Sequence, residues 1–179
     1  MKRHSLLALL DAYAPENGEE ENMYLDMIEF IRKNPDCFKR TLLEGHITAS
    51  GWVLSADKKS VLLMHHFKLN RWFQPGGHCD GDPDVKSVAR KEVWEETGVK
   101  DLILAKEGIF DIDIHTIPAR KDIPEHLHYD VRFAFLSDKD QQIAVNSESL
   151  DVKWIPVSEV AKYNDSESIM RMVRKTISL

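Results

Sequence analysis

Three glutamates lie close together in one segment of the chain: Glu92, Glu95 and Glu96. At 100° per residue, Glu92 and Glu96 fall within an apolar stripe that includes Val88 and Val93, and Glu95 lies at its edge. A carboxylate that is buried without a partner costs several kcal/mol. A divalent cation would remove this cost, and residues four apart on a helix lie within reach of one ion. The pattern therefore favours a cation site.

The alternative is that the glutamates are solvated and pair with the neighbouring bases Lys86, Arg90 and Lys91. Gly76 and Gly77 favour the cation site, because glycine lets the backbone approach a ligand closely. The carbonyl of Gly77 is the weaker third candidate ligand. Hard carboxylate oxygens favour Mg²⁺, Mn²⁺ or Ca²⁺ over zinc.

The glutamates require a helix to position them, and the segment 85–97 is predicted to form one. We expect Asp82 to be its N-cap and Pro83 its first residue, with Asp84 adding negative charge to the first turn. Gly98 is expected to end the helix in a left-handed conformation.

The rest of the chain alternates between strand-like and helix-like segments. Runs rich in β-branched and aromatic residues predict strands over 46–55, 60–67, 102–109, 127–136 and 152–157. Further helices are predicted over 4–14, 20–33, 157–163 and 166–177. Strands on both sides of a central helix indicate an α/β sandwich around a mixed sheet. Residues 1–40 are expected to be a helical extension packed on a main domain over 41–179.

Several of these residues match the Nudix box: Gly77, Glu92, Val93, Glu95, Glu96, Gly98 and Val99. The flanking segments 72–77 and 153–156 also resemble the Nudix hydrolase superfamily. The resemblance implies a Nudix-like α/β/α sandwich with extra N-terminal helices. It also implies a Mg²⁺- or Mn²⁺-dependent pyrophosphohydrolase that cleaves a diphosphate linkage in a small nucleoside diphosphate derivative or nucleotide.

Within that resemblance, Glu92 and Glu96 are expected to bind the metal, with Gly77 as the weaker third ligand. Glu92 and Glu95 are the expected catalytic residues, and Glu95 would complete the metal shell or orient water. Two positions depart from the box: Pro83 replaces a glutamate and Lys91 replaces an arginine. Lys91 keeps the charge but lacks the planar fork of arginine.

The aspartates around Pro83 are candidates to take over part of the missing glutamate's role: Asp80, Asp82 and Asp84. Glu125 and Glu148 are candidates for a distal base, and each is equally well explained as an exposed loop acid. The substrate-binding candidates are Lys68, Arg71, His128 and Arg132. Lone basic residues are more often ordinary surface residues.

His126 and His128 alternate along a predicted strand, and Asp130 and Arg132 continue the same face. This row is interpreted either as solvated or as lining a substrate pocket. Trp72 and Phe73 would either stack on a base or pack in the core.

The composition narrows the class of protein. A length of 179 residues with 42% hydrophobic residues fits one soluble domain. The net charge of −6 argues against nucleic acid or an anionic membrane as the main partner. Two cysteines without a metal-ligand spacing indicate a reducing compartment. The apolar run 6–10 ends at Asp11, so it is predicted to be an amphipathic helix and not a signal peptide. A cytoplasmic protein is expected.

Other functions stay open. A Nudix-fold regulatory module that binds a nucleotide or sugar nucleotide without turnover is compatible with Pro83 and Lys91. The superfamily also includes an isopentenyl diphosphate isomerase with a catalytic cysteine, but the order of residues around Cys79 differs from its pattern, so Cys79 is expected to be a loop residue. The N-terminal helices are expected either to cover the site or to form a homodimer interface.

Overall fold

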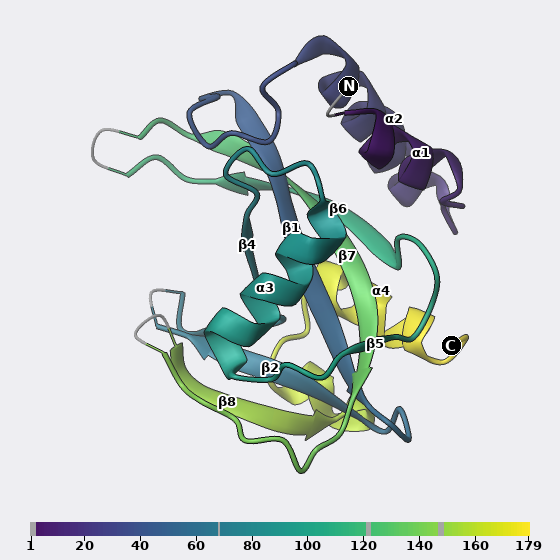
Figure 1. Ribbon diagram of the computed structural model, residues 1–179, viewed down its shortest axis with the longest axis vertical. Coiled ribbons are helices and arrows are strands. Elements are labelled where there is room, and N and C mark those ends of the chain that lie inside the picture. Colours follow the sequence, from purple (N-terminus) through teal and green to yellow (C-terminus); the bar gives the residue numbers. More distant parts are fainter. Residues whose placement is uncertain (1–2, 68, 121–122, 147–148) are drawn as a thin grey trace.

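The computed structural model describes residues 3–67, 69–120, 123–146 and 149–179. Within these ranges the chain forms a curled mixed sheet of eight strands, with helices on both faces (Figure 1). The strands are β1 (Gly45–Ser55), β2 (Ser60–His66), β3 (Arg71–Phe73), β4 (Gly76–His78), β5 (Ile103–Leu104), β6 (Asp111–Ile117), β7 (His126–Ser137) and β8 (Ser149–Pro156). The helices are α1 (His4–Asp11), α2 (Gly18–Lys33), α3 (Val85–Thr97), the 3₁₀ helix η1 (Val157–Lys162) and α4 (Glu167–Thr176).

The sheet is organised around β1 and β7, which run parallel along the whole of β1. β4 pairs with the first half of β1, β2 pairs with its second half, and β6 pairs with the first half of β7. β8 lies against β2. Because β1 changes partners halfway along its length, the sheet curls. None of the helices in the described ranges has both the length and the apolar character that crossing a bilayer requires.

The predicted α/β sandwich with N-terminal helices is confirmed, and the bounds of the α3 helix agree with the prediction. The strand predicted over 102–109 is wrong. Only Ile103 and Leu104 pair with β7, and the chain then turns at Gly108, whose φ of +77° ends an extended run. The short strands β3 and β4 and the strand β6 were not predicted.

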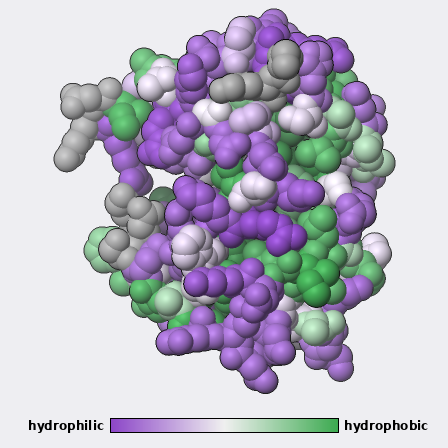
Figure 2. Space-filling model, in the orientation of Figure 1, coloured by the Kyte–Doolittle hydropathy of each residue, from purple (hydrophilic) through white to green (hydrophobic). Residues whose placement is uncertain are grey.

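Helix α3 and helix α4 cover opposite faces of the sheet (Figure 1). On one face, Ile47, Ala49 and Val53 of β1 belong to a core that also contains Val93 of α3 and Ile31 of α2. The outer side of α3 faces the viewer in Figure 2, where hydrophilic residues predominate. On the opposite face of the sheet, β1 contributes polar residues in its first half and Trp52 and Leu54 in its second, where α4 and η1 pack.

A buried ionic network joins β6, β7 and α4. Asp111 is fully buried and accepts hydrogen bonds from Arg132 at 3.0 Å, from Arg171 at 2.9 and 3.0 Å, and from Lys175 at 2.8 Å. Asp113 also accepts from Arg171 at 2.9 Å. Lys175 continues the network to Glu20 of α2. The network therefore ties the N-terminal helices and α4 to the same sheet edge.

The N-cap of α3 is Asp84, so the prediction of Asp82 is wrong. The carboxylate of Asp82 accepts the N–H of Asp84 at 2.9 Å, which closes a turn around Pro83 and leaves that proline outside the helix. Asp84 then accepts the N–H of Ser87 at 3.1 Å and its hydroxyl at 2.8 Å. Gly98 ends the helix with a φ of +79°, as predicted.

We expect Asp84→Ala to lower the free energy of unfolding by about 0.5–2 kcal/mol, because it removes the acceptor for a helix N-terminal N–H. Chemical denaturation measures the loss. Asp82→Ala is the matched control and is expected to cost less, since it removes only the turn contact to Asp84. An equal or larger loss in Asp82→Ala would contradict the capping assignment.

Candidate active site

The glycine pair and the α3 glutamates meet where β4 passes under α3. A Cβ placed on Gly77 would lie 2.4 Å from Oε2 of Glu92, so a larger residue at this position would require the carboxylate to move. The N–H of Gly76 donates a hydrogen bond to Oε2 of Glu96 at 2.8 Å. The two carboxylates therefore approach the same short stretch of backbone, as the sequence pattern implies.

The three glutamates of α3 differ in how deeply they are buried. Glu96 is buried, with 8% of its surface exposed; Glu92 is half-buried, and Glu95 is exposed. Glu95 lies 3.6 Å from Nζ of Lys91, which supplies the i, i+4 pairing expected at this position. The side chain of Glu95 is thus held at the edge of the site and not beneath the helix.

The residues present fit a hard divalent cation. The oxygens of Glu92 and Glu96 lie against a backbone with no side chain at Gly77, and such a cradle suits the oxygen-rich shell of Mg²⁺ or Mn²⁺. Glu92, Glu96 and the Gly77 carbonyl would hold the ion.

The aspartates near Pro83 have local partners. Asp80 pairs with Arg40 at 2.5 Å, Asp82 closes the turn before α3, and Asp84 caps it. Each carboxylate thus has a contact other than the one that a replacement for the missing glutamate would make.

The substrate-binding candidates are dispersed. Arg71 is exposed on β3 and lies 3.4 Å from Asp165. Arg132 is only 3% exposed and is engaged by Asp111, Asp113 and Asp130, so its guanidinium has a structural role in the ionic network. Lys68 lies outside the described residues.

Of the two distal-base candidates, the structure describes only Glu125. Glu125 is exposed just before β7, and Glu148 lies outside the described residues. Trp72 packs against the second core, with its ring stacked 5.0 Å from that of His65 and edge-on to Tyr163 at 5.4 Å. Cys79 is buried, and burial raises the pKa of its thiol far above the ordinary value. A buried neutral thiol is consistent with its expected place as a loop residue.

The first half of the α4-side sheet face carries a histidine cluster, defined as His46, His78, His126 and His128. His46 on β1 is directly opposite His128 on β7. His78 on β4 is opposite Thr48, which follows His46 on the same face of β1. Ring centroids in the cluster lie 4.8–5.2 Å apart for the pairs in contact. Asp130, next along the face, accepts hydrogen bonds from Thr48 and Ser50 at 3.0 and 2.8 Å.

Burial controls the charge of this cluster. It lowers the pKa of His78 to about 4 and also lowers the pKa values of His46 and His128, and the neighbouring rings add to the effect. The lowered pKa values favour the neutral form of the His46, His78 and His128 imidazoles. Asp130 and Arg132 are buried, which contradicts the solvated interpretation for that half of the row. Sequence reasoning identified His126 and His128 but missed His46 and His78, because the strand registers that bring them together are not visible in the sequence.

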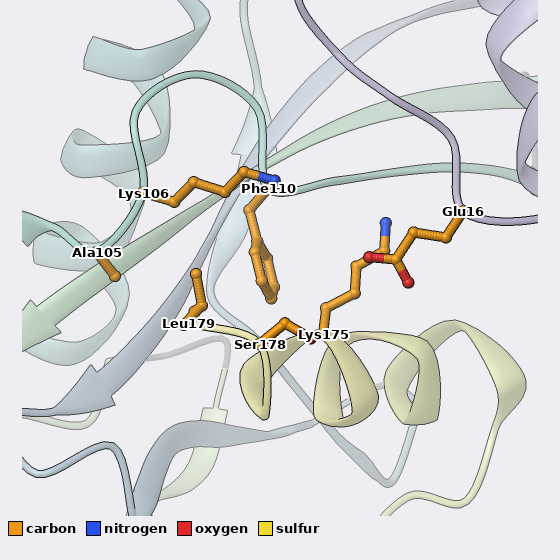
Figure 3. Close-up of a pocket in the computed structure, with 7 residues that line it drawn as sticks. All are labelled: Glu16, Ala105, Lys106, Phe110, Lys175, Ser178 and Leu179. Carbon is orange, nitrogen blue, oxygen red and sulfur yellow. The ribbon is translucent and has the colours of Figure 1, made fainter.

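Two cavities lie away from the glutamates. One, of about 290 Å³, is lined by residues at the α4 end of the ionic network, and Figure 3 shows Glu16 and Lys175 reaching toward the same side of it beside Phe110. The other, of about 310 Å³, lies between α2 and the β6–β7 pair. Neither of these two cavities is lined by a residue of the 77–99 segment.

The chain is similar to several known proteins. The "Putative mutator protein MutT4" of Mycobacterium tuberculosis is 34% identical over 91 residues, which cover 50% of this chain and 34% of that longer protein. The phosphatase NudJ of Shigella boydii is 25% identical over 131 residues, covering 71% of this chain and 78% of NudJ. A C. elegans Ap4A hydrolase, in a binary complex, superposes with a TM-score of 0.60 at 17% identity, covering 74% of this chain and 95% of that one.

The chain thus spans about a third of the length of its MutT4 relative but most of NudJ and of the Ap4A hydrolase. The NUDIX domain model matches residues 45–175, from the start of β1 to the last turn of α4. Helices α1 and α2 precede the match. This match, which covers most of the chain, identifies it as a member of the Nudix hydrolase superfamily.

Proposed function

We propose that this protein is a metal-dependent hydrolase that cleaves a diphosphate linkage in a nucleoside diphosphate derivative or nucleotide. The observation that carries the proposal is the approach of Glu92 and Glu96 to the Gly76–Gly77 backbone. A bound Mg²⁺ or Mn²⁺ would neutralise phosphoryl oxygens and lower the pKa of a bound water.

The residues of the glutamate site would have different roles in this reaction. Glu92 and Glu96, one helical turn apart, would hold the cation, and the absence of a side chain at Gly77 leaves space beside Glu92. Glu95 is exposed and can reach a water on the solvent side of the helix, where it would orient that water for attack on phosphorus. Lys91 positions Glu95 by its charge.

A regulatory module without turnover is the competing function. It would bind a nucleotide or sugar nucleotide in the same fold, and the absence of a glutamate at Pro83 is what favours it. Release of phosphate from nucleotides, dinucleotides and nucleotide sugars, measured with Mg²⁺ and with Mn²⁺ after a coupled phosphatase step, distinguishes the two. Saturable binding of a nucleotide without any release under either metal would establish the module instead of the hydrolase.

We expect Lys91→Met to lower kcat several-fold while leaving KM nearly unchanged, because Lys91 touches Glu95 and not the leaving group. Both side chains are about half exposed, so stability should change by only about 0–1 kcal/mol. Lys91→Arg should retain turnover. Lys86→Met, on an exposed position of the same helix, is the matched control for loss of charge. Equal kcat values for Lys91→Met and Lys86→Met would remove the positioning role of Lys91.

A further inference from the structure

The histidine cluster lies on the opposite side of β4 from the glutamates. Successive residues of a strand point to opposite faces, and a Cβ on Gly77 would point at Glu92 of α3. His78 follows Gly77 and therefore projects to the other face, where it meets His46 and His128. The cluster is thus separated from the glutamate site by the sheet itself.

Three histidines of the cluster place ring nitrogens close enough together to be candidate metal ligands. Among the described residues, His46, His78 and His128 offer one ring nitrogen each, and these three nitrogens lie within 4.8 Å of one another. Tetrahedral Zn²⁺ with bonds of 2.0–2.1 Å needs nitrogens about 3.3 Å apart, so each nitrogen has to move inward by at most about 1 Å. A shift of that size is within the reach of small side-chain rotations.

Three buried ring nitrogens of the cluster lack a hydrogen-bond partner. Both ring nitrogens of His46, which is 3% exposed, and Nε2 of His128 are buried with no hydrogen-bond partner. Burying such a nitrogen without a partner costs free energy. A metal ion that accepts one lone pair from each ring would remove part of this cost, since neutral imidazole is the ligand form of histidine.

A fourth histidine stands beside the three. Nδ1 of His126 lies 2.9 Å from the carbonyl oxygen of Pro124. Because a carbonyl only accepts, Nδ1 carries the hydrogen and the lone pair is on Nε2. Its ring lies 5.1 Å from that of His46 and 5.2 Å from that of His128. The fourth coordination position therefore falls to water or, after a larger movement, to His126.

We propose that His46, His78 and His128 form a binding site for a borderline divalent transition metal such as Zn²⁺. The chemistry differs from that of the glutamate site, because imidazole nitrogens select Zn²⁺, Ni²⁺ or Cu²⁺ whereas carboxylate oxygens select Mg²⁺ or Mn²⁺. The proposal uses none of the glutamates and does not depend on the proposed hydrolase function.

Calorimetric titration of the metal-free full chain with Zn²⁺, in the presence of excess Mg²⁺, tests the site. We expect one equivalent to bind. His78→Phe and His128→Phe keep an aromatic ring in the cluster but remove a ligand. Each should weaken Zn²⁺ binding at least about a hundredfold, because loss of a residue that only hydrogen-bonds to a metal ligand already costs about 10–100-fold. His4→Phe, at an exposed position of α1, and Glu92→Gln should both still bind one equivalent of Zn²⁺ tightly.

The visible spectrum of the Co²⁺-loaded wild-type protein gives a second test that needs no variant. Cobalt in a tetrahedral nitrogen site absorbs strongly in the visible, whereas octahedral cobalt bound by carboxylates and water absorbs weakly. A strong spectrum that persists with excess Mg²⁺ supports the site. A weak spectrum, or Zn²⁺ binding that survives both phenylalanine variants and is lost in Glu92→Gln, overturns the proposal.

Discussion

Glu92→Gln and Glu96→Gln should each lower kcat by about 10²–10³-fold. A neutral amide binds a hard dication far more weakly than a carboxylate does, and metal stabilisation of transition-state charge contributes several kcal/mol. Glutamine keeps the volume, and at position 96 it keeps an oxygen that can accept the Gly76 N–H. The loss is therefore expected in turnover, with little change in the thermal midpoint.

Steady-state kinetics with the best substrate from the phosphate-release screen measures this effect. Glu107→Gln, at an exposed position between β5 and β6, is the control that removes the same charge elsewhere. Chelation by EDTA should abolish activity of the wild type, and Mg²⁺ should restore it. Near-normal turnover in both variants, with EDTA ineffective, would refute the metal-hydrolase proposal.

Asp111→Asn should lower the free energy of unfolding by about 3–5 kcal/mol, the loss expected when one partner of a buried ion pair is removed. Asp111 is fully buried and forms ion pairs with Arg132, Arg171 and Lys175. Asparagine fits the space but leaves these cations without that carboxylate. The same change would loosen the attachment of α4 to the sheet.

Urea denaturation compares Asp111→Asn with Asp165→Asn, whose carboxylate is 80% exposed and lies 3.4 Å from Arg71. The control should change stability by about 0–1 kcal/mol. Similar losses in the two variants would show that the buried network is not a major source of stability.

The network also predicts how stability depends on pH. Burial by itself would raise the pKa of Asp111, but the surrounding Arg132, Arg171 and Lys175 outweigh it and lower that pKa. The stabilising contribution is therefore present above the ordinary aspartate pKa and is lost as the pH falls through the lowered value. Asp111→Asn should accordingly remove part of the acid sensitivity of the wild type.

The local sequence determined α3 and its glutamates. Apolar periodicity and Gly98 define the bounds of this helix, and the spacing of Glu92 and Glu96 places both carboxylates on its sheet side. These features depend on contacts between residues a few positions apart, which can be read from the chain. The cap was the exception, because both Asp82 and Asp84 are suitable N-cap residues and only the structure shows that Asp82 accepts the N–H of Asp84 while Asp84 caps the helix.

Tertiary structure decided the rest of the polar chemistry. Arg132 looked available for a phosphate in the sequence, but the pairing of β6 with β7 and the packing of α4 surround it with carboxylates. His46 and His78 joined the histidines of β7 only through the parallel register of β1 with β7 and the antiparallel register of β1 with β4. A shift of either strand pairing by one residue would turn these side chains to the other face of the sheet. Register is a property of strands far apart in the chain, so the sequence alone could place His46 and His128 on predicted strands but could not bring them together, and it did not predict the strand that carries His78.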